Sequence, residues 1–373
     1  MNDSRMVDSE LRIGFHGVRG ALAESAIQSM FTTHAATAFR NKTLVTAPYE
    51  TIDRLFVALR NSEVDQIMLP VENARSGTLH TTMDRLITSR PPVHIAGEYV
   101  YDEPYCLVAP AGATLDSITE IHSHPHVLDQ CHENLTMLLP SGNSRRVARV
   151  QGESTASCAK RVSDLTRRDH LSRLQHMRLV DPTRAPAPPT TVGCAPSSHP
   201  GCPDDSHGPY GQERPGRQHH HHVYGNLPHR AAIASRSAAA LYDLQVLIDS
   251  VVPEPHSSQT RYVLVAQSPV HPEPHQTPKT SLAITVANRA GSLYKVLACF
   301  ALRDVNVCKL ESRPSRRATG RSRLSTPWEY TLYLDVDGSA TVDEPVRCAI
   351  NHLREFAERV QVLGSYPRYT PMN

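Results

Sequence analysis

Hydrophobic positions in the first 270 residues switch repeatedly between a strand spacing and a helix spacing. Leu11–His16 is a short apolar run that predicts a strand, and a helical stretch follows from Ala21. Residues 52–59 place their apolar side chains on one helix face, and Gln66–Val71 predicts a buried strand. Short strands that alternate with helices predict an α/β domain with largely parallel sheets. Ligands of such sheets bind where strands end, against helix N-termini.

The pattern changes near Lys279 to the order strand, helix, strand, strand, helix, strand. This is the order of the ferredoxin-like fold, so residues 279–370 are predicted to form a small α+β domain. An open edge of such a sheet can pair with a second copy, which favours a dimer. The predicted elements are 281–287, 291–302, 305–311, 328–336, 343–359 and 360–366.

One segment between these parts has a composition unlike the rest. Asp181–Arg230 contains 10 Pro, 7 His and 6 Gly and almost no aliphatic side chains, so we expect an insertion at about 166–230 to be disordered. The spacing of Cys194, His199, Cys202 and His207 matches none of the usual zinc frameworks, which favour C-x2-4-C pairs. A His-rich linker is therefore the preferred interpretation, and no metal site is predicted.

Charge and cysteine usage exclude several classes of protein. The 39 Lys and Arg against 37 Asp and Glu give no general attraction to nucleic acid or anionic lipid. No apolar run approaches the ~18 residues that a membrane span needs, and Met1–Glu10 does not resemble a secretory signal. The eight cysteines form no C-x-x-C pair. We therefore expect reduced thiols, a cytoplasmic location for the chain as given, and no nucleic-acid or membrane partner.

Polar clusters stand at the predicted ends of four strands. They are Glu72–Thr78, Ser123–His124, Ser154–Ser157 and Thr260–Tyr262. The hydroxyls of the first three precede helices and could serve simply as N-caps. Thr260 and Arg261 instead precede a β-rich run and have no helix to cap. A guanidinium there offers a planar fork for a carboxylate, and the neighbouring hydroxyl offers a proton.

Five blocks of this sequence follow the order found in one known family. The blocks are LPVENARSGTLH (69–80), SHPHVLDQC (123–131), GESTASCAKRV (152–162), AAIASRSAAALY (231–242) and TRY (260–262). They resemble, in order, the VPVEN-S-x-x-G, SHPxxLxQC, STAxxA, AAIAS and TRF blocks of prephenate dehydratases. Residues 288–316 and 363–367 resemble the ACT regulatory domain of the same enzymes, particularly the plant and algal prephenate/arogenate dehydratases. The resemblance covers nearly the whole chain except Leu165–Arg230.

The resemblance implies a cofactor-free decarboxylative dehydration in L-phenylalanine biosynthesis. Prephenate would give phenylpyruvate, or arogenate would give phenylalanine. The family's activity-linked Thr maps to Thr260, which we expect to hydrogen-bond the departing hydroxyl within a network. For Arg261 two roles stay open: a clamp on a substrate carboxylate, or a brace of the cleft through Glu72. The residues expected to line the substrate cleft are Glu72, Asn73, Gly77, Thr78, Ser123, Gln130, Ser154, Thr155 and Ala156.

The resemblance also implies a fold and a regulator. Residues 11–268 would form a two-lobed α/β catalytic domain like the periplasmic binding proteins, with the active site between the lobes. The ACT domain at 279–370 would bind phenylalanine as feedback effector, and a homodimer or homotetramer is expected. A plastid location is possible if a transit peptide is missing from this sequence. The expected effector-binding residues are Asn288, Ala290, Gly291, Ser292, Leu293, Glu311, Ser312 and Arg313. A helix-entry turn is an equally good reason for Gly291.

Several positions depart from the family pattern. Leu22 and Ala23 replace a Tyr-Ser pair, Ala74 replaces the Ser after VPVEN, and Ser258 replaces an Asn before TRF. Each change removes or moves a hydrogen-bonding group. A catalytically decayed amino-acid-binding regulatory protein is therefore the alternative to an enzyme, and the sequence leaves the choice between prephenate and arogenate open.

Overall fold

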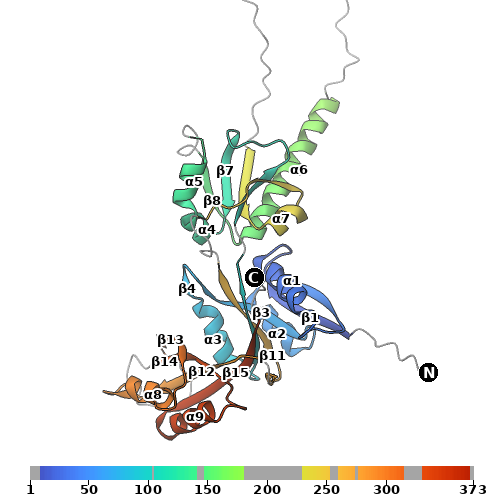
Figure 1. Ribbon diagram of the computed structural model, residues 1–373. Coiled ribbons are helices and arrows are strands. Elements are labelled where there is room, and N and C mark those ends of the chain that lie inside the picture. Colours follow the sequence, from blue (N-terminus) through green and yellow to red (C-terminus); the bar gives the residue numbers. More distant parts are fainter. Residues whose placement is uncertain are drawn as a thin grey trace, which may run out of the picture.

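The computed structural model describes residues 9–102, 105–140, 147–179, 229–252, 259–273, 276–314 and 330–369. Two β-sheets organise these residues, one with the strand order β13-β14-β12-β15-β5-β11-β3-β1-β2 and one with the order β10-β6-β9-β7-β8. Figure 1 shows the smaller sheet in an upper lobe and the larger sheet running through the two lower parts of the molecule. The two-lobed arrangement of α/β elements predicted for the first part of the chain is thereby confirmed.

The first lobe contains one half of the larger sheet and three helices. Helix α2 illustrates why these segments fold as they do, because the Thr51 hydroxyl caps its first turn and Leu55, Phe56 and Leu59 are buried on one face. The elements of this lobe are β1 (Ser9–His16), α1 (Leu22–His34), β2 (Lys42–Tyr49), α2 (Ile52–Arg60), β3 (Gln66–Asn73), β4 (Gly77–Thr78), α3 (His80–Thr88), β5 (His94–Tyr101) and β11 (Thr260–Ala266).

The second lobe is built on the smaller sheet. Its elements are β6 (Cys106–Pro110), β7 (Ile118–Ser123), α4 (Pro125–Gln130), α5 (His132–Leu138), β8 (Ala148–Gln151), α6 (Thr155–Leu179), β9 (His229–Ala234), α7 (Arg236–Leu241) and β10 (Leu244–Ile248). Pro125 begins α4 in the first turn, where its missing N–H costs nothing. The lobes touch where Ser25 of α1 hydrogen-bonds Ser237 of α7 at 2.7 Å.

The prediction of largely parallel sheets was wrong. In the first lobe β1 pairs in parallel with β2 and β3, but β11 is antiparallel to β3 and β5. In the second lobe β7 pairs in parallel with β8 and β9, but β6 is antiparallel to β9 and β10. The reason is the double crossing of the chain, which leaves the first lobe after β5 and returns to it as β11 in the opposite direction.

Residues 278–314 and 330–369 form a four-stranded antiparallel sheet with two helices on one face. The helix-facing side is held by apolar side chains such as Leu282, Ile284, Val296 and Phe300, all fully buried. The ferredoxin-like order predicted from the sequence is confirmed. The elements are β12 (Pro278–Val286), α8 (Ser292–Ala301), β13 (Val307–Pro314), β14 (Tyr330–Asp337), α9 (Glu344–Phe356) and β15 (Arg359–Tyr369).

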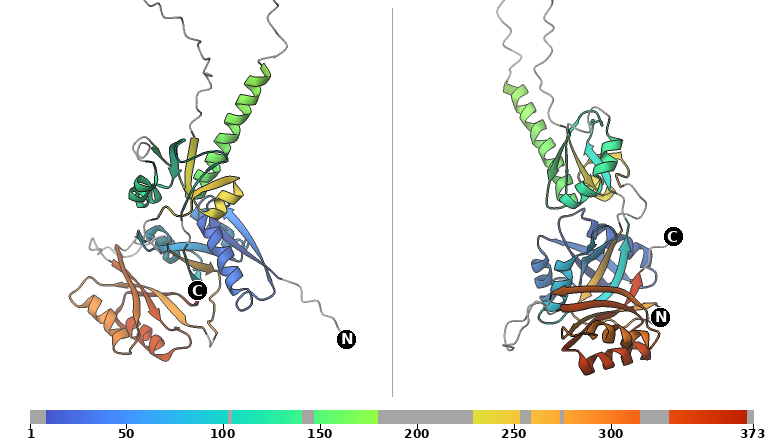
Figure 2. Two further views of the ribbon diagram at one scale, coloured as in Figure 1. Left: turned by 45° about the horizontal axis from the view of Figure 1, so that its top comes forward. Right: turned by 90° about the vertical axis from the view of Figure 1, so that its left-hand side faces the viewer.

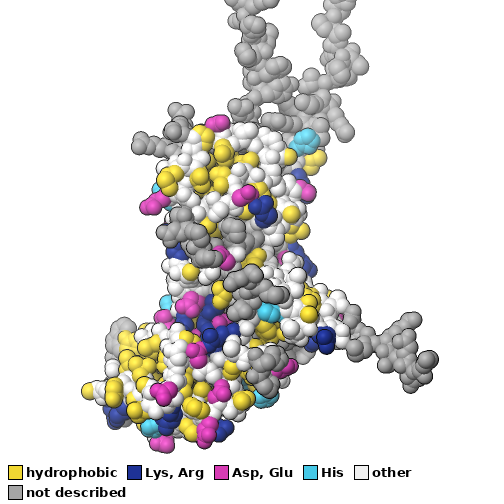
Figure 3. Space-filling model, in the orientation of Figure 1, with side chains coloured by type: hydrophobic (Ala, Val, Ile, Leu, Met, Phe, Trp, Pro, Cys, Tyr) yellow, Lys and Arg dark blue, Asp and Glu magenta, His cyan; other side chains and the backbone are white. Residues whose placement is uncertain are grey.

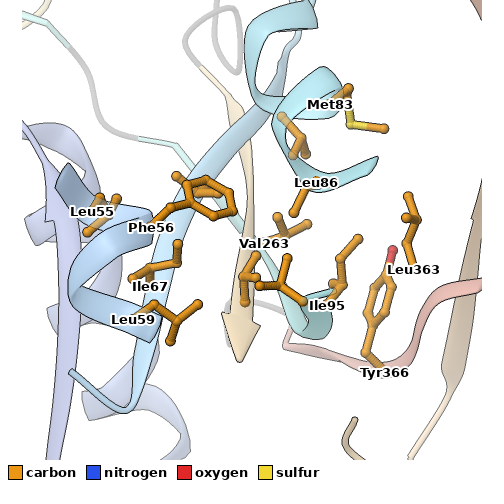
Figure 4. Close-up of a cluster of buried hydrophobic side chains, with 14 of the residues drawn as sticks. Leu55, Phe56, Leu59, Ile67, Met83, Leu86, Ile95, Val263, Leu363 and Tyr366 are labelled. Atoms are coloured by element: carbon orange, nitrogen blue, oxygen red, sulfur yellow. The ribbon is translucent and has the colours of Figure 1, made fainter. Parts of the chain in front are cut away.

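The opposite face of this C-terminal sheet packs on the first lobe. Met83 and Leu86 of α3 belong to the same buried cluster as Leu363 and Tyr366 of β15 (Figure 4). Strand β15 also pairs in parallel with β5, so the two halves become one continuous sheet. Gly364 permits this approach, because a Cβ atom there would overlap the carbonyl of Ile95. Both views in Figure 2 place the first lobe between the second lobe and the C-terminal unit.

The boundaries of the predicted insertion need a correction. Helix α6 continues to Leu179 and β9 starts at His229, so 166–179 and the last two residues of the expected disordered interval are ordered elements. No Pro or Gly interrupts 155–179, which allows the helix to propagate. Residues 180–228, with Cys194, His199, Cys202 and His207, lie outside the described residues.

Candidate active site

Thr260 and Asn73 lie side by side at the ends of two neighbouring strands. The register of β11 and β3 pairs the two residues directly, and Asn73 Nδ2 lies 3.0 Å from Thr260 Oγ1. Because an amide nitrogen can only donate, the threonine oxygen accepts this bond and keeps its own proton for another acceptor. Thr260 is 8% exposed, so little water competes for that proton.

The orientation of the Asn73 amide is fixed by the turn that follows β3. Its Oδ1 accepts the backbone N–H of Arg75 at 3.1 Å and that of Ser76 at 3.2 Å, and the Ser76 hydroxyl lies 3.3 Å away. Only an oxygen can accept from these donors, so Nδ2 has to face Thr260. The Asn73–Thr260 contact is therefore built into the backbone of the turn.

The first turn of α6 packs against the lobe that carries Thr260. Ser154 caps the helix, since its Oγ accepts the N–H of Ser157 at 3.1 Å. Ala156, fully buried, lies in the same apolar cluster as Tyr99 of β5 and Tyr262 of β11. The positive end of this helix thus lies between the lobes, near the strands that present Asn73 and Thr260.

A cavity of about 300 Å³ lies between the lobes beside this pair. Arg75 and Ser76 line it from the turn after β3, and His126, Asp129 and Gln130 line it from α4. Ser76 links the cavity to Thr260, because its hydroxyl contacts Asn73 and Asn73 contacts Thr260. Sequence reasoning missed Arg75, His126 and Asp129, which occupy positions that the family blocks leave unspecified.

Arg261 points away from this cavity into a group of acidic side chains. Its Nη1 lies 2.6 Å from Asp335 Oδ2 and 3.1 Å from Glu98 Oε2, and its Nε lies 3.4 Å from Glu72. Burial opposes the charged form, but the carboxylates of Asp335 and Glu98 outweigh it and raise the pKa of Arg261. Of the two roles left open by the sequence, this geometry favours the structural brace.

Known proteins resemble this chain over most of its length. The family model described as Prephenate dehydratase matches residues 13–172. Arogenate dehydratase/prephenate dehydratase 2 of Arabidopsis thaliana, a chloroplastic protein, is 29% identical over 98% of this chain and 74% of its own length. This chain is similar to the prephenate and arogenate dehydratases.

Solved structures show the same fold. A prephenate dehydratase from Arthrobacter aurescens in complex with L-Phe gives a TM-score of 0.66 at 24% identity, covering 96% of this chain and 90% of that one. GqqA, described as a novel type of quorum quenching acylase, gives a TM-score of 0.64 at 22% identity, covering 96% and 98%. These likenesses establish the architecture, and the chemistry has to be argued from the site.

Two residues predicted to line the dehydratase cleft turn toward the C-terminal unit instead. Glu72 accepts from Lys309 Nζ at 2.7 Å, and the Thr78 hydroxyl donates to Glu311 at 3.1 Å. Although burial raises it, hydrogen bonds from His80 and Thr78 lower the pKa of Glu311 below its ordinary value. Figure 3 shows charged side chains of both signs gathered where these parts of the molecule meet. Glu72 and Thr78 therefore connect the segment of β3 and β4 to β13.

Of the remaining residues predicted to line the cleft, some lie at the cavity or at the start of α6, and others have a structural reason for their identity. Gln130 lines the cavity and Thr155 begins α6, 8% exposed. Ser123 is fully buried, with its hydroxyl donating to the carbonyl of Ile233 at 3.0 Å, so it stabilises the second lobe and does not face the cavity. Gly77 has φ +74 in the turn between β3 and β4, which explains a glycine there without a ligand.

The C-terminal sheet separates the residues predicted to bind the effector. Asn288, Ala290 and Gly291 precede α8 on the helix-covered face, where Gly291 has φ +80. Glu311 and Arg313 lie on the opposite face, and Arg313 donates to Asp84 of α3. Because side chains alternate along a strand, Ser312 is directed to the α8 side between them. The turn before α8 is exposed, as are Leu293 in the first turn of that helix and Ser312.

The positions that depart from the family have limited structural consequences. Leu22 and Ala23 begin α1, and the backbone N–H of Ala74 donates to the Gln259 carbonyl at 2.9 Å, which keeps the turn against β11. Ser258 lies outside the described residues.

Within the described ranges, no three His, Cys, Asp or Glu side chains converge as metal ligands. No helix in the described part of the chain combines the length and apolarity needed to cross a bilayer.

Proposed function

We propose that this chain catalyses the decarboxylative dehydration of prephenate or arogenate, in the biosynthesis of L-phenylalanine, with Thr260 as the hydroxyl that assists departure of the leaving group. The observation that carries the proposal is the 3.0 Å hydrogen bond from Asn73 to Thr260 at the edge of the interlobe cavity. It supports the catalytic alternative over a decayed regulatory protein, because the pair is intact despite Ala74 and Ala23 nearby.

The reaction needs little from the protein beyond position and charge. The bond from C1 to the ring carboxylate breaks and leaves carbon dioxide, while its electron pair enters the ring. The C4–oxygen bond breaks at the other end of the diene, and the departing oxygen takes a proton to become water. Thr260 donates a hydrogen bond to that oxygen, and Asn73 supports the threonine oxygen as charge shifts toward it. The N-terminus of α6 favours the anionic substrate.

The test is a paired assay of the purified chain with prephenate and with arogenate, following phenylpyruvate and phenylalanine. Turnover of at least one acid, with release of carbon dioxide, is the expected result. A folded protein that converts neither acid but binds phenylalanine would favour the decayed regulatory protein. Circular dichroism and a thermal melt establish that the tested sample is folded.

Replacing Asn73 by alanine should lower kcat more than it raises KM. The threonine oxygen loses its donor and the turn loses the acceptor for Arg75 and Ser76, so the hydroxyl is less well oriented. We expect a loss of about 10–100-fold in kcat, less than the 10²–10⁴-fold contribution of a positioned proton donor, because Asn73 acts through Thr260. Steady-state kinetics measure it, and a change confined to KM would contradict the proposed support of Thr260.

Phenylalanine is proposed as an effector that binds at the exposed turn 288–293. The L-Phe complex of the Arthrobacter protein supports an amino-acid ligand for this fold. The contacts Lys309–Glu72 and Glu311–Thr78 offer a path from the C-terminal sheet to the catalytic turn. Effector binding would act by favouring one arrangement of these contacts over another.

A second copy of the chain is proposed to cover the outer face of the C-terminal unit. Tyr294 of α8 and Leu302 at the end of that helix are 76% and 79% exposed, and Leu310 of β13 is also exposed. Figure 3 shows hydrophobic side chains gathered over this part of the molecule. An apolar surface of this kind favours association.

The plastid is proposed as the place of action, which the chloroplastic Arabidopsis relative supports.

A further inference from the structure

Two opposite charges face the interlobe cavity from different lobes. Arg75 stands on the turn after β3 in the first lobe, and Asp129 stands on α4 in the second. Both side chains are exposed, and neither has an ion pair with another described residue. Arg261 and Arg313 are by contrast held by Asp335 and Asp84. The cavity therefore offers one uncommitted cation and one uncommitted anion to a ligand.

We propose that Arg75 and Asp129 recognise the zwitterionic end of an α-amino acid, so that arogenate is the preferred substrate of this chain. The inference rests on the function proposed above and specifies its substrate. The two candidate acids share a ring carboxylate and a side-chain carboxylate. They differ in one group, an ammonium in arogenate and a keto oxygen in prephenate.

The chemistry of the two charges distinguishes these groups. A guanidinium binds a carboxylate through paired N–H donors, and both acids supply that carboxylate to Arg75. An ionised carboxylate only accepts hydrogen bonds, so Asp129 attracts an ammonium and repels a keto oxygen. A site whose polar group loses its partner with the wrong substrate discriminates more strongly than one that only lacks a contact.

The position of the cavity agrees with this orientation of the substrate. Ser76 lines the cavity and its hydroxyl contacts Asn73, so an amino-acid end bound at Arg75 and Asp129 would direct the ring toward the Asn73–Thr260 pair. A volume of about 300 Å³ is sufficient for a small acid of this size. Gln130 and His126 supply further polar atoms on the α4 side.

Charge-removing variants test the inference through the ratio of kcat/KM for arogenate to that for prephenate. Wild type should favour arogenate. Asp129→Asn should lower the ratio by at least about tenfold, which corresponds to ~1.4 kcal/mol, because arogenate loses its ammonium partner and prephenate loses a repulsion. Arg75→Gln should reduce kcat/KM for both acids and leave the ratio nearly unchanged, since both carry the side-chain carboxylate.

Glu133→Gln is the matched control. It removes one exposed negative charge from the adjacent helix α5, outside the cavity, and should leave both rates unchanged. An unchanged ratio in Asp129→Asn, or an equal shift in Glu133→Gln, would overturn the inference. Isothermal titration with the two acids gives a second readout that needs no turnover. Selective loss of arogenate affinity in Asp129→Asn would support the recognition even if the chain converted neither acid, which would refute only the proposed reaction.

Discussion

Thr260→Ala is expected to reduce kcat for prephenate or arogenate by about 10²–10⁴-fold, the usual contribution of a positioned proton donor. The methyl of alanine cannot donate to the departing oxygen, and Asn73 Nδ2 loses its acceptor at Oγ1. The side chain is small and at the end of β11, so the free energy of unfolding should change far less than the rate. Steady-state kinetics and urea unfolding on the same samples measure the two effects separately.

Thr260→Ser is the control for this prediction. Serine keeps the hydroxyl on the same strand end and within reach of Asn73, so it should restore most of the rate lost in the alanine variant. If serine and alanine were equally inactive, the loss would have to come from packing of the threonine methyl. If alanine retained wild-type kcat, Thr260 would not take part in the reaction.

Arg261→Met is expected to destabilise the protein by about 3–5 kcal/mol, because removal of one partner leaves buried carboxylates without compensation. Asp335 and Glu98 are 2% and 5% exposed, and without Arg261 the side chain of Asp335 would keep the hydrogen bond from the Ser281 hydroxyl but lose its ion pair. Lys279 still serves Glu98, so Asp335 should account for most of the cost. Urea unfolding followed by circular dichroism measures the change, and Arg261→Met/Asp335→Asn should recover part of it.

Arg167→Met provides the comparison for an exposed arginine. Arg167 pairs with Asp243 at 2.9 Å, but both side chains are more than half exposed, so the loss should stay below about 1 kcal/mol. The measurements on Arg261→Met also distinguish the two roles considered for Arg261. Unchanged stability with a large rise in KM in Arg261→Met would identify Arg261 as a substrate clamp and refute the structural brace.

The sequence predicts features that depend on the local hydrophobic pattern, and it predicts single polar residues that stand at the end of a strand. The alternation of strands and helices predicts the α/β class, the family resemblance implies the two lobes, and Thr260 stands out because no helix follows it to be capped. Pairing of β11 with β3 brings Asn73 next to it. The antiparallel placement of β11 could not be derived, because it depends on how the chain returns from the second lobe.

Contacts between distant parts of the chain could not be predicted from the sequence. Arg75 and Asp129 are polar residues in exposed segments, and only the approach of two lobes gives them a shared cavity. Glu311 was assigned to the effector site from its motif, but the alternation of β13 turns it toward Thr78 and His80. In each case the partner lies more than fifty residues away along the chain.

The continuity of β15 with β5 has a practical consequence for truncation. A fragment ending near Ala266 would expose the backbone edge of β5 and the Met83 and Leu86 side chains that β15 now covers. Unpaired edges and apolar faces of this kind promote aggregation in a separated fragment. Soluble expression of an isolated catalytic part would therefore require charged replacements on α3, or retention of the final strand as a covering segment.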